Sequence, residues 1–106
     1  MHTEQALLAL AALAQESRLA IYRLLVQAGP TPLAASKIAQ ALGMPASSLS
    51  FHLKELQHAG LIAARQEGRF LLYSAQYPAM HALVAFLTEN CCGGAPCPPG
   101  ACPPNA

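Results

Sequence analysis

Hydrophobic positions within residues 45–62 recur at the spacing of a helix that buries one stripe of its surface. Leu49, Leu53 and Leu56 follow one another at intervals of four and three residues. The remaining positions are mostly small or polar, and Gly60 can supply the left-handed conformation that ends many helices. Such a helix can enter a DNA major groove without steric or electrostatic penalty. An ordinary amphipathic surface helix would show the same pattern, so the neighbouring segments must decide.

A short helix is predicted just before this one. Its sequence, KIAQAL at residues 37–42, follows Ser36 as a capping residue, and Gly43-Met44-Pro45 connects it to the next helix. Two short helices joined by a turn of three or four residues are typical of a helix-turn-helix. In that arrangement the first helix crosses the DNA backbone and the second reads base edges.

Two apolar runs that follow predict a β-hairpin. Residues 61–66 and 70–75 are separated by a short polar segment in which Gly68 can adopt the positive φ of the turn. Arg65 and Arg69 lie at or beside the tip of this hairpin. A hairpin with a basic tip directly after a reading helix is a wing, which can contact phosphates beside the groove.

The terminal helices are apolar on nearly every face. One is predicted over residues 3–14, capped by Thr3, and the other over residues 77–90. A helix that is apolar all round must be buried on several sides, so we expect these two helices to pair across a dimer axis rather than only within one subunit. A further helix over residues 17–28 should turn inward Leu19, Tyr22, Leu25 and Val26.

These elements predict a mainly α fold with a β-hairpin wing (α+β): a winged helix-turn-helix that dimerises through its N- and C-terminal helices. Residues 1–90 would form this DNA-binding and dimerisation domain, and residues 91–106 a flexible tail. The net charge of the 106 residues is only +1, so charge alone does not indicate DNA binding. The sequence shows neither a signal peptide nor an apolar run long enough to span a membrane. We therefore expect a cytoplasmic protein without a membrane partner.

All four cysteines lie in the tail, among prolines and glycines and without any charged residue. Adjacent cysteines such as Cys91 and Cys92 are poor disulfide partners, but they are well placed to chelate a soft ion. Arsenic(III) or antimony(III) requires three thiolates, and the third would come from Cys97, which has the shorter loop, or from Cys102. Two alternatives remain open for the same cysteines, a zinc or cadmium site and a thiol redox switch.

An enzyme is not expected. A nucleophilic cysteine needs a lowered pKa, whereas these cysteines follow a helix C-terminus, whose partial negative charge disfavours the thiolate. The sequence also gives no indication of an organic cofactor.

Three segments together resemble the ArsR/SmtB family of metalloid- and metal-responsive repressors: LAALAQESRLAIYRLL, SSLSFHLKELQHAGLI and RQEGRFLLYSA. The resemblance implies a winged-helix homodimer that represses a resistance operon until an inducer releases it from DNA. Residues 34–42 lack the cysteine motif of many arsenic-responsive members, and His81 lacks the aspartate of the zinc-responsive ones. Asn90-Cys91-Cys92 is instead similar to arsenic-responsive members that carry N-C-C at the end of the last helix, with a further cysteine a few residues on.

The expected function is a transcriptional repressor that binds an imperfect palindromic operator and leaves it when arsenite or a related trivalent metalloid binds the tail. The alternative is a redox-sensing or zinc/cadmium-responsive repressor that uses the same cysteines. The residues predicted to contact DNA are Lys37, Ser47, Ser48, Ser50, Phe51, Lys54, Arg65 and Arg69.

Overall fold

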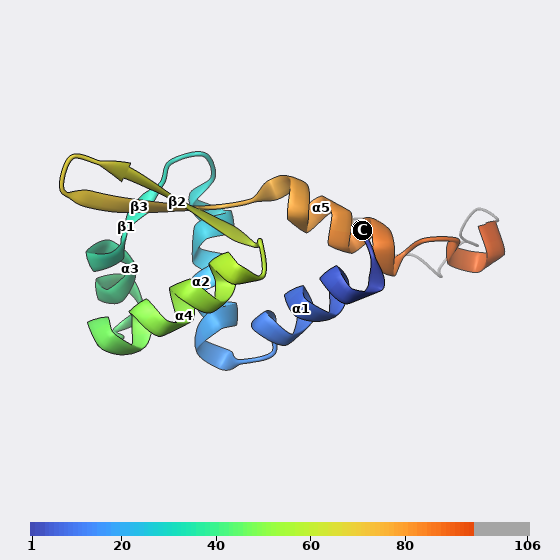
Figure 1. Cartoon of the computed structure of the whole chain (residues 1–106), viewed down its shortest axis with the longest axis horizontal. Helices are drawn as coiled ribbons and strands as arrows, with labels where there is room; N and C mark the ends of the chain where they lie inside the picture. Colours follow the sequence, from blue (N-terminus) through green and yellow to red (C-terminus); the bar gives the residue numbers. More distant parts are fainter. Residues whose placement is uncertain (95–106) are drawn as a thin grey trace.

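The computed structural model describes residues 1–94, which form five α-helices, a three-stranded sheet and a terminal 3₁₀ turn (Figure 1). The fold class is the one predicted, mainly α with a β-hairpin wing. In chain order the elements are α1 (Thr3–Leu13), α2 (Glu16–Ala28), β1 (Leu33–Ala34), α3 (Ala35–Leu42), α4 (Ala46–His58), β2 (Ile62–Glu67), β3 (Phe70–Ala75), α5 (Tyr77–Leu87) and η1 (Cys91–Gly94).

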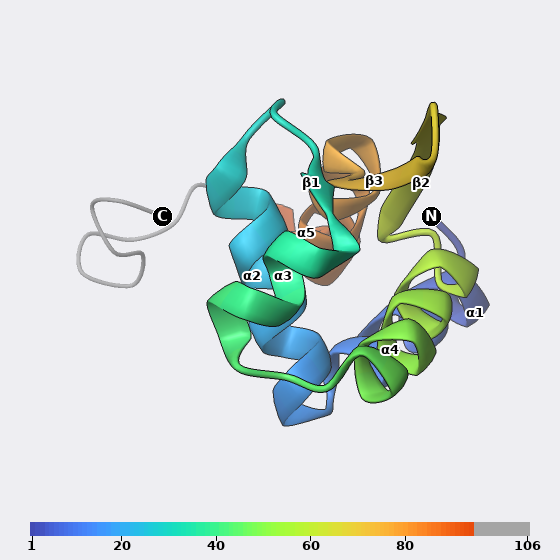
Figure 2. The same ribbon diagram turned by 90° about the vertical axis from the view of Figure 1, so that its left-hand side faces the viewer.

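The hydrophobic core is organised around the leucine stripe of α4. Leu49, Leu53 and Leu56 are each at most 3% exposed, which confirms the predicted spacing. Helix α2 packs against both α3 and α4, and Figure 2 shows α3 in front of α2 and α4 in front of α1. The other buried residues come from the other four α-helices, from the sheet and from Leu61 just before β2: Ala6, Ala9, Ala12, Ile21, Tyr22, Leu25, Ile38, Leu61, Ile62, Tyr73, Ala75 and Leu83.

The wing is a hairpin of β2 and β3 whose turn is made by Gly68, with a φ of 61° as predicted. The sequence did not predict the third strand, β1. Leu33 pairs with Tyr73 and Ala34 with Leu72, so the strand order is β1-β3-β2. Because β1 leads directly into α3, this pairing ties the wing to the helix-turn-helix.

Helix α5 is joined to the rest of the fold at its N-terminal end. The Tyr77 hydroxyl donates a hydrogen bond of 3.1 Å to the carbonyl oxygen of Val26 in α2. Just before α5, the Gln76 backbone N–H donates to the Leu61 carbonyl oxygen at 2.8 Å. These contacts fix where α5 leaves the domain, while its far end extends away from the wing (Figure 1).

Several local predictions were wrong. Helix α5 ends at Leu87 rather than near Asn90, and the first four residues of the expected tail form a 3₁₀ turn. Ser36 does not cap α3, because the helix already begins at Ala35. Thr3 likewise is the first residue of α1, and the His2 backbone N–H donates its hydrogen bond to Gln5 Oε1. Leu19 is exposed, and Ile21 takes the inward position on α2.

Replacing Leu56 tests the importance of the core stripe. Leu56→Ala removes a fully buried side chain and leaves a cavity, so we expect a loss of about 2–5 kcal/mol in the free energy of unfolding. Urea denaturation at one fixed protein concentration measures this loss. The adjacent Gln57→Ala, at an exposed position, should change stability by less than about 0.5 kcal/mol. Equal effects of the two changes would contradict this packing.

Candidate nucleic-acid interface

The outward face of α4 carries the side chains predicted to read DNA. Ser47, Ser48, Ser50, Phe51 and Lys54 are all exposed, and Phe51 is 57% exposed despite its aromatic ring. Burial of the leucine stripe forces this result, because residues between the buried positions of a helix must point the other way. The face combines hydroxyl donors and acceptors, one apolar ring and one cation, which are groups that can contact bases and phosphates.

The start of α4 is also suited to an anion. Pro45 is the N-cap residue and provides no side-chain hydrogen bond to the helix, and no acidic residue occupies the first turn. The first backbone N–H groups of a helix lack partners within the helix, and its dipole places a partial positive charge there. A DNA phosphate could accept hydrogen bonds from these groups. Lys37 on α3 is exposed as well.

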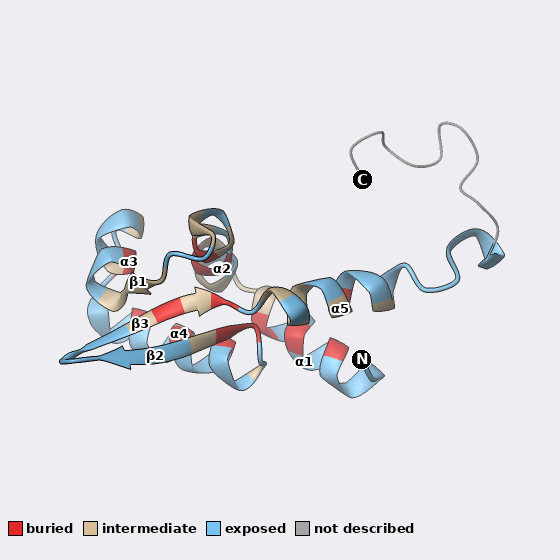
Figure 3. Ribbon diagram, turned by 90° about the horizontal axis from the view of Figure 1, so that it is seen from above, coloured by how far each residue is buried: buried red, intermediate tan, exposed pale blue. Residues whose placement is uncertain are grey.

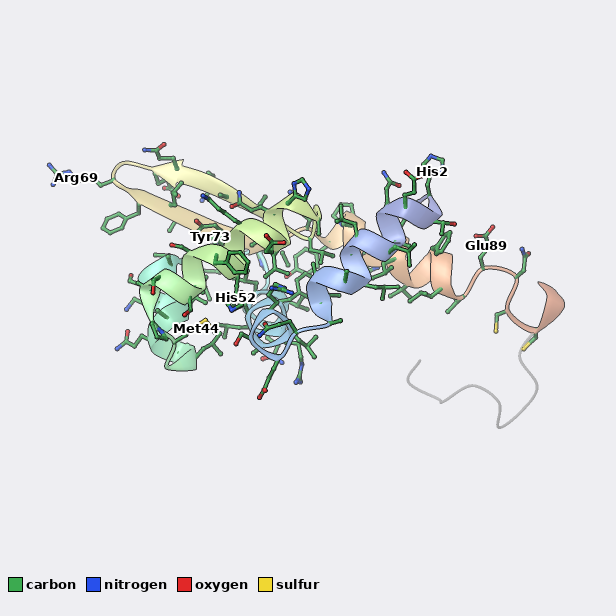
Figure 4. All side chains as sticks on the ribbon, turned by 60° about the horizontal axis from the view of Figure 1, so that its bottom comes forward. His2, Met44, His52, Arg69, Tyr73 and Glu89 are labelled. Atoms are coloured by element: carbon green, nitrogen blue, oxygen red, sulfur yellow. The ribbon has the colours of Figure 1, made fainter. Side chains whose placement is uncertain are left out.

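The wing carries its cations as expected but also an unexpected aromatic residue. Arg69 lies at the far tip of the hairpin and points away from the domain (Figure 4). The Arg65 guanidinium lies 2.7 Å from a Glu67 carboxylate oxygen, and since both side chains are well exposed, a phosphate can displace the glutamate at small cost. Phe70 is 64% exposed beside Arg69. Its position directly after the turn was the signal that sequence reasoning overlooked.

Large apolar side chains also lie exposed on the outer faces of α1 and α5. In α1 the residues turned into the core are the small Ala6, Ala9 and Ala12, whereas Leu7 is 61% exposed. In α5 only Leu83 is buried, and Leu87 is 58% exposed. Figure 3 shows that the outer surfaces of both helices are largely exposed. This arrangement leaves apolar surface in contact with water, and covering it with another protein surface would be favourable.

The cysteine pair follows α5 and is exposed. The sulfur atoms of Cys91 and Cys92 are 3.7 Å apart, well beyond the roughly 2.05 Å of a disulfide bond. Cys92 has a φ of 56°, in the left-handed region, as the pair turns through η1. The hydrogen bond with the Cys91 thiol, helped by desolvation and by the charge of Cys91, raises the pKa of Cys92 above its ordinary value. At neutral pH this residue is therefore a thiol.

These two sulfurs could ligate one soft ion together. Two thiolates bound to one zinc at about 2.3 Å in tetrahedral geometry lie about 3.8 Å apart, close to the separation found here. Within residues 1–94 there is no group of three or more His, Cys, Asp and Glu side chains that could hold a metal. The predicted third ligands, Cys97 and Cys102, lie outside the described residues.

Comparison with known proteins places this geometry in a family. Residues 13–65 match a family described as a helix-turn-helix domain. The chain is similar to the HTH-type transcriptional regulator YgaV of Escherichia coli K12, with 32% identity over 89 residues that cover 84% of this chain and 88% of YgaV. It is also similar in structure to an ArsR-like transcriptional regulator from Rhodococcus sp. RHA1, with a TM-score of 0.75. The chain belongs to the ArsR-like helix-turn-helix transcriptional regulators.

The Rhodococcus structure shares 25% sequence identity, and the match covers 86% of this chain and 83% of that one. A homodimeric winged helix-turn-helix domain from Mycobacterium bovis, Mb0332, shares 30% identity with a TM-score of 0.66, covering 87% and 85%. A possible transcriptional regulator for arsenical resistance shares 26% identity with a TM-score of 0.66, covering 76% and 81%.

The relatives are transcriptional regulators and not enzymes, so the expectation that this ArsR-like chain is not an enzyme is confirmed. Among the described residues, no helix has both the length and the apolar character needed to cross a bilayer.

Lys54 provides a test of the outward face of α4 in this ArsR-like regulator. Lys54→Ala should weaken binding to all DNA sequences by a similar factor, because a lysine that meets a phosphate reads no sequence information. The slope of log affinity against log salt should become shallower by about 0.9 for each phosphate that the variant no longer neutralises. Fluorescence anisotropy at several salt concentrations measures both effects.

A suitable control is Arg23→Ala, which removes an equally charged, exposed side chain from α2. The control should leave the salt slope unchanged. If both variants changed the slope equally, α4 would not be the DNA-facing helix.

Proposed function

We propose that this protein is a homodimeric repressor that binds an imperfect palindromic operator in the cytoplasm and is released when arsenite or a related trivalent metalloid binds its C-terminal cysteines. The observation that carries the proposal is the exposed cysteine pair, with sulfurs 3.7 Å apart, placed just beyond the last helix of an ArsR-like regulator. A solved structure similar to this chain is described as a possible regulator for arsenical resistance, which supports the same effector class.

The proposed dimer joins the apolar outer faces of α1 and α5. Three alanines of α1 and Leu83 of α5 pack inward. The exposed side chains on the two helices are large: Leu7, Leu8, Leu10, Val84 and Leu87. Covering these side chains against a second copy would stabilise the pair by about 25 cal/mol for each Å² of apolar surface removed from water. The homodimeric state of the similar Mb0332 domain supports this arrangement.

Two copies related by a two-fold axis would present two α4 helices to one side of a DNA duplex. Successive major grooves on that side lie about 34 Å apart, which accounts for a palindromic operator. In this arrangement the α4 serines and Phe51 face base edges, and Phe51 can contact thymine methyl groups. Lys37, Lys54, Arg65 and Arg69 contact phosphates, and Phe70 at the wing tip packs against the sugar-phosphate backbone.

The chemistry of the tail favours a trivalent metalloid. Arsenite at neutral pH is As(OH)₃, and each thiol that binds replaces one As–O bond with an As–S bond. The displaced hydroxide leaves as water with the thiol proton, so three cysteines release three waters without any change in oxidation state. Cys91 and Cys92 supply two of these sulfurs, and Cys97 the third, with Cys102 as the alternative. A neutral thiol such as Cys92 is a competent reactant in this exchange.

Ion binding at this position can act on DNA through the dimer. The cysteines follow α5, and α5 is part of the proposed dimer interface, so a constraint on the tail changes how the two subunits pack. A coupling free energy of about 1–3 kcal/mol would lower operator affinity about 5–150-fold. The second candidate is a redox or zinc/cadmium switch at the same residues, which the short distance between the two sulfurs also allows.

Serine substitutions test the effector site. Cys91→Ser and Cys92→Ser should each abolish release from operator DNA by arsenite without weakening DNA binding in its absence, because the reading helix is untouched. An electrophoretic mobility shift titrated with arsenite and with antimonite measures this. If Cys97 is the third ligand, Cys97→Ser should behave like them while Cys102→Ser retains release. The opposite pattern would identify Cys102 as the third ligand. Arsenite release that persists in Cys91→Ser would exclude this site.

The pH dependence of ion binding distinguishes the two candidate effectors. Exchange of As(OH)₃ with thiols releases no net proton, so arsenite affinity should be nearly constant between about pH 6 and about pH 8. Zinc or cadmium must displace the thiol protons, and the raised pKa of Cys92 extends that competition to higher pH. Their affinity should rise about tenfold per pH unit for each proton released. Calorimetric titration of the reduced protein at three pH values measures both.

A further inference from the structure

A single arginine connects the N-terminal helix to the reading helix. Arg18 lies in the first turn of α2, where its backbone N–H donates to Gln15 Oε1 at 2.9 Å. Its side-chain Nε donates a hydrogen bond of 2.6 Å to the Ala12 carbonyl oxygen, in the last turn of α1. Its Nη1 lies 3.3 Å from Nδ1 of His52 on α4. One guanidinium therefore contacts α1 and α4 at the same time.

The chemistry of the two side chains determines how this contact works. A guanidinium can only donate hydrogen bonds, so in this contact His52 Nδ1 is the acceptor. The planar fork of arginine holds its donors in fixed relative directions. It can therefore fix the orientation of two acceptors toward each other, whereas the single ammonium of a lysine cannot hold both in the same way.

His52 lies at the boundary between the buried and the DNA-facing sides of α4. It is half-buried, between the exposed Phe51 and the buried Leu53. Its ring makes an edge-to-face contact with Phe51, with centroids 5.6 Å apart. Figure 4 shows His52 at the junction of α4 with α2. The contact between Arg18 and His52 is thus one side chain away from a proposed base-reading residue.

We propose that Arg18 is a positioning residue that sets the angle of α4 relative to α1, and through it the operator half-site spacing that the dimer prefers. This inference rests on the proposed function, in which α1 belongs to the dimer interface and α4 reads DNA. The leucine stripe resists removal of α4 from the core, but apolar contacts have little directionality and oppose a small rotation weakly. The Arg18 hydrogen bonds supply the missing directional constraint.

The experiment compares half-site spacing between variants. Wild-type protein first selects operators from a randomised pool of DNA duplexes, and the selected palindrome is then remade with its half-sites one or two base pairs closer or farther apart. Arg18→Lys keeps the charge but loses the fork. We expect its affinity for the best wild-type spacing to fall about tenfold, which corresponds to the free energy of one charge-assisted hydrogen bond. Its affinities for operators of different spacing should also become more alike.

Substitutions at His52 provide a second and independent test. His52→Leu removes the acceptor and should reproduce the flattened spacing profile, whereas His52→Asn offers an amide oxygen near the place of Nδ1 and should restore most of the preference. Arg18→Lys combined with His52→Leu should lose no more affinity than Arg18→Lys alone, because Arg18→Lys already removes the contact with His52. Arg23→Lys on the same helix is the matched control, since the Arg23 side chain makes no hydrogen bond or ion pair within residues 1–94, and it should keep the wild-type profile.

Two results would overturn the inference, and they are distinguishable. If Arg18→Lys and His52→Leu lower the melting temperature but keep the wild-type spacing profile, Arg18 stabilises the fold without positioning α4. If wild-type protein selects no palindrome from the pool, the proposed function fails, and this inference fails with it.

Discussion

Burial of one leucine stripe on α4 is the constraint on which the rest of the structure depends. Leu49, Leu53 and Leu56 are buried where α4 packs against α1, α2, α3 and β2, and this burial decides which side of α4 faces outward. The outward side can then carry hydroxyls, a cation and an exposed phenyl ring without cost to the core. A protein that reads DNA needs such a separation, because stability comes from one face of a helix and recognition from the other.

Helix α1 differs from α4 in which of its residues face the core. In α1 the small alanines face the core and the large leucines face outward, so the single chain leaves much of its most apolar surface uncovered. Small inward side chains let α1 approach the core closely, and large outward ones provide area for association with a second copy. Folding and the proposed dimerisation thus use different faces of the same helix. On α5, likewise, Leu83 is buried while Val84 and Leu87 are exposed.

The cysteine pair takes part in neither packing scheme. It follows α5, outside the core, so an ion can bind there without disturbing the leucine stripe. Its influence on DNA would have to pass through α5 and the dimer interface to α1. The Arg18 bridge offers a direct route onward, from the end of α1 to His52 on the reading helix. The proposed effector site beyond α5 and the proposed reading helix, which is held in the core, would be coupled in this way.

Sequence periodicity by itself determined the leucine stripe, the helix-turn-helix and the glycine turn of the wing, because each is a local pattern whose residues lie within one or two elements. The exposure of the predicted reading residues followed from the same periodicity. It did not reveal β1, since two residues that pair with a distant strand have no pattern of their own. It placed Leu19 inside and missed Ile21, because α2 carries apolar residues on more than one face and its sequence does not show which of them the core will cover. The contact between Arg18 and His52 joins residues 34 positions apart, and only the packing of α1, α2 and α4 around one core brings them together.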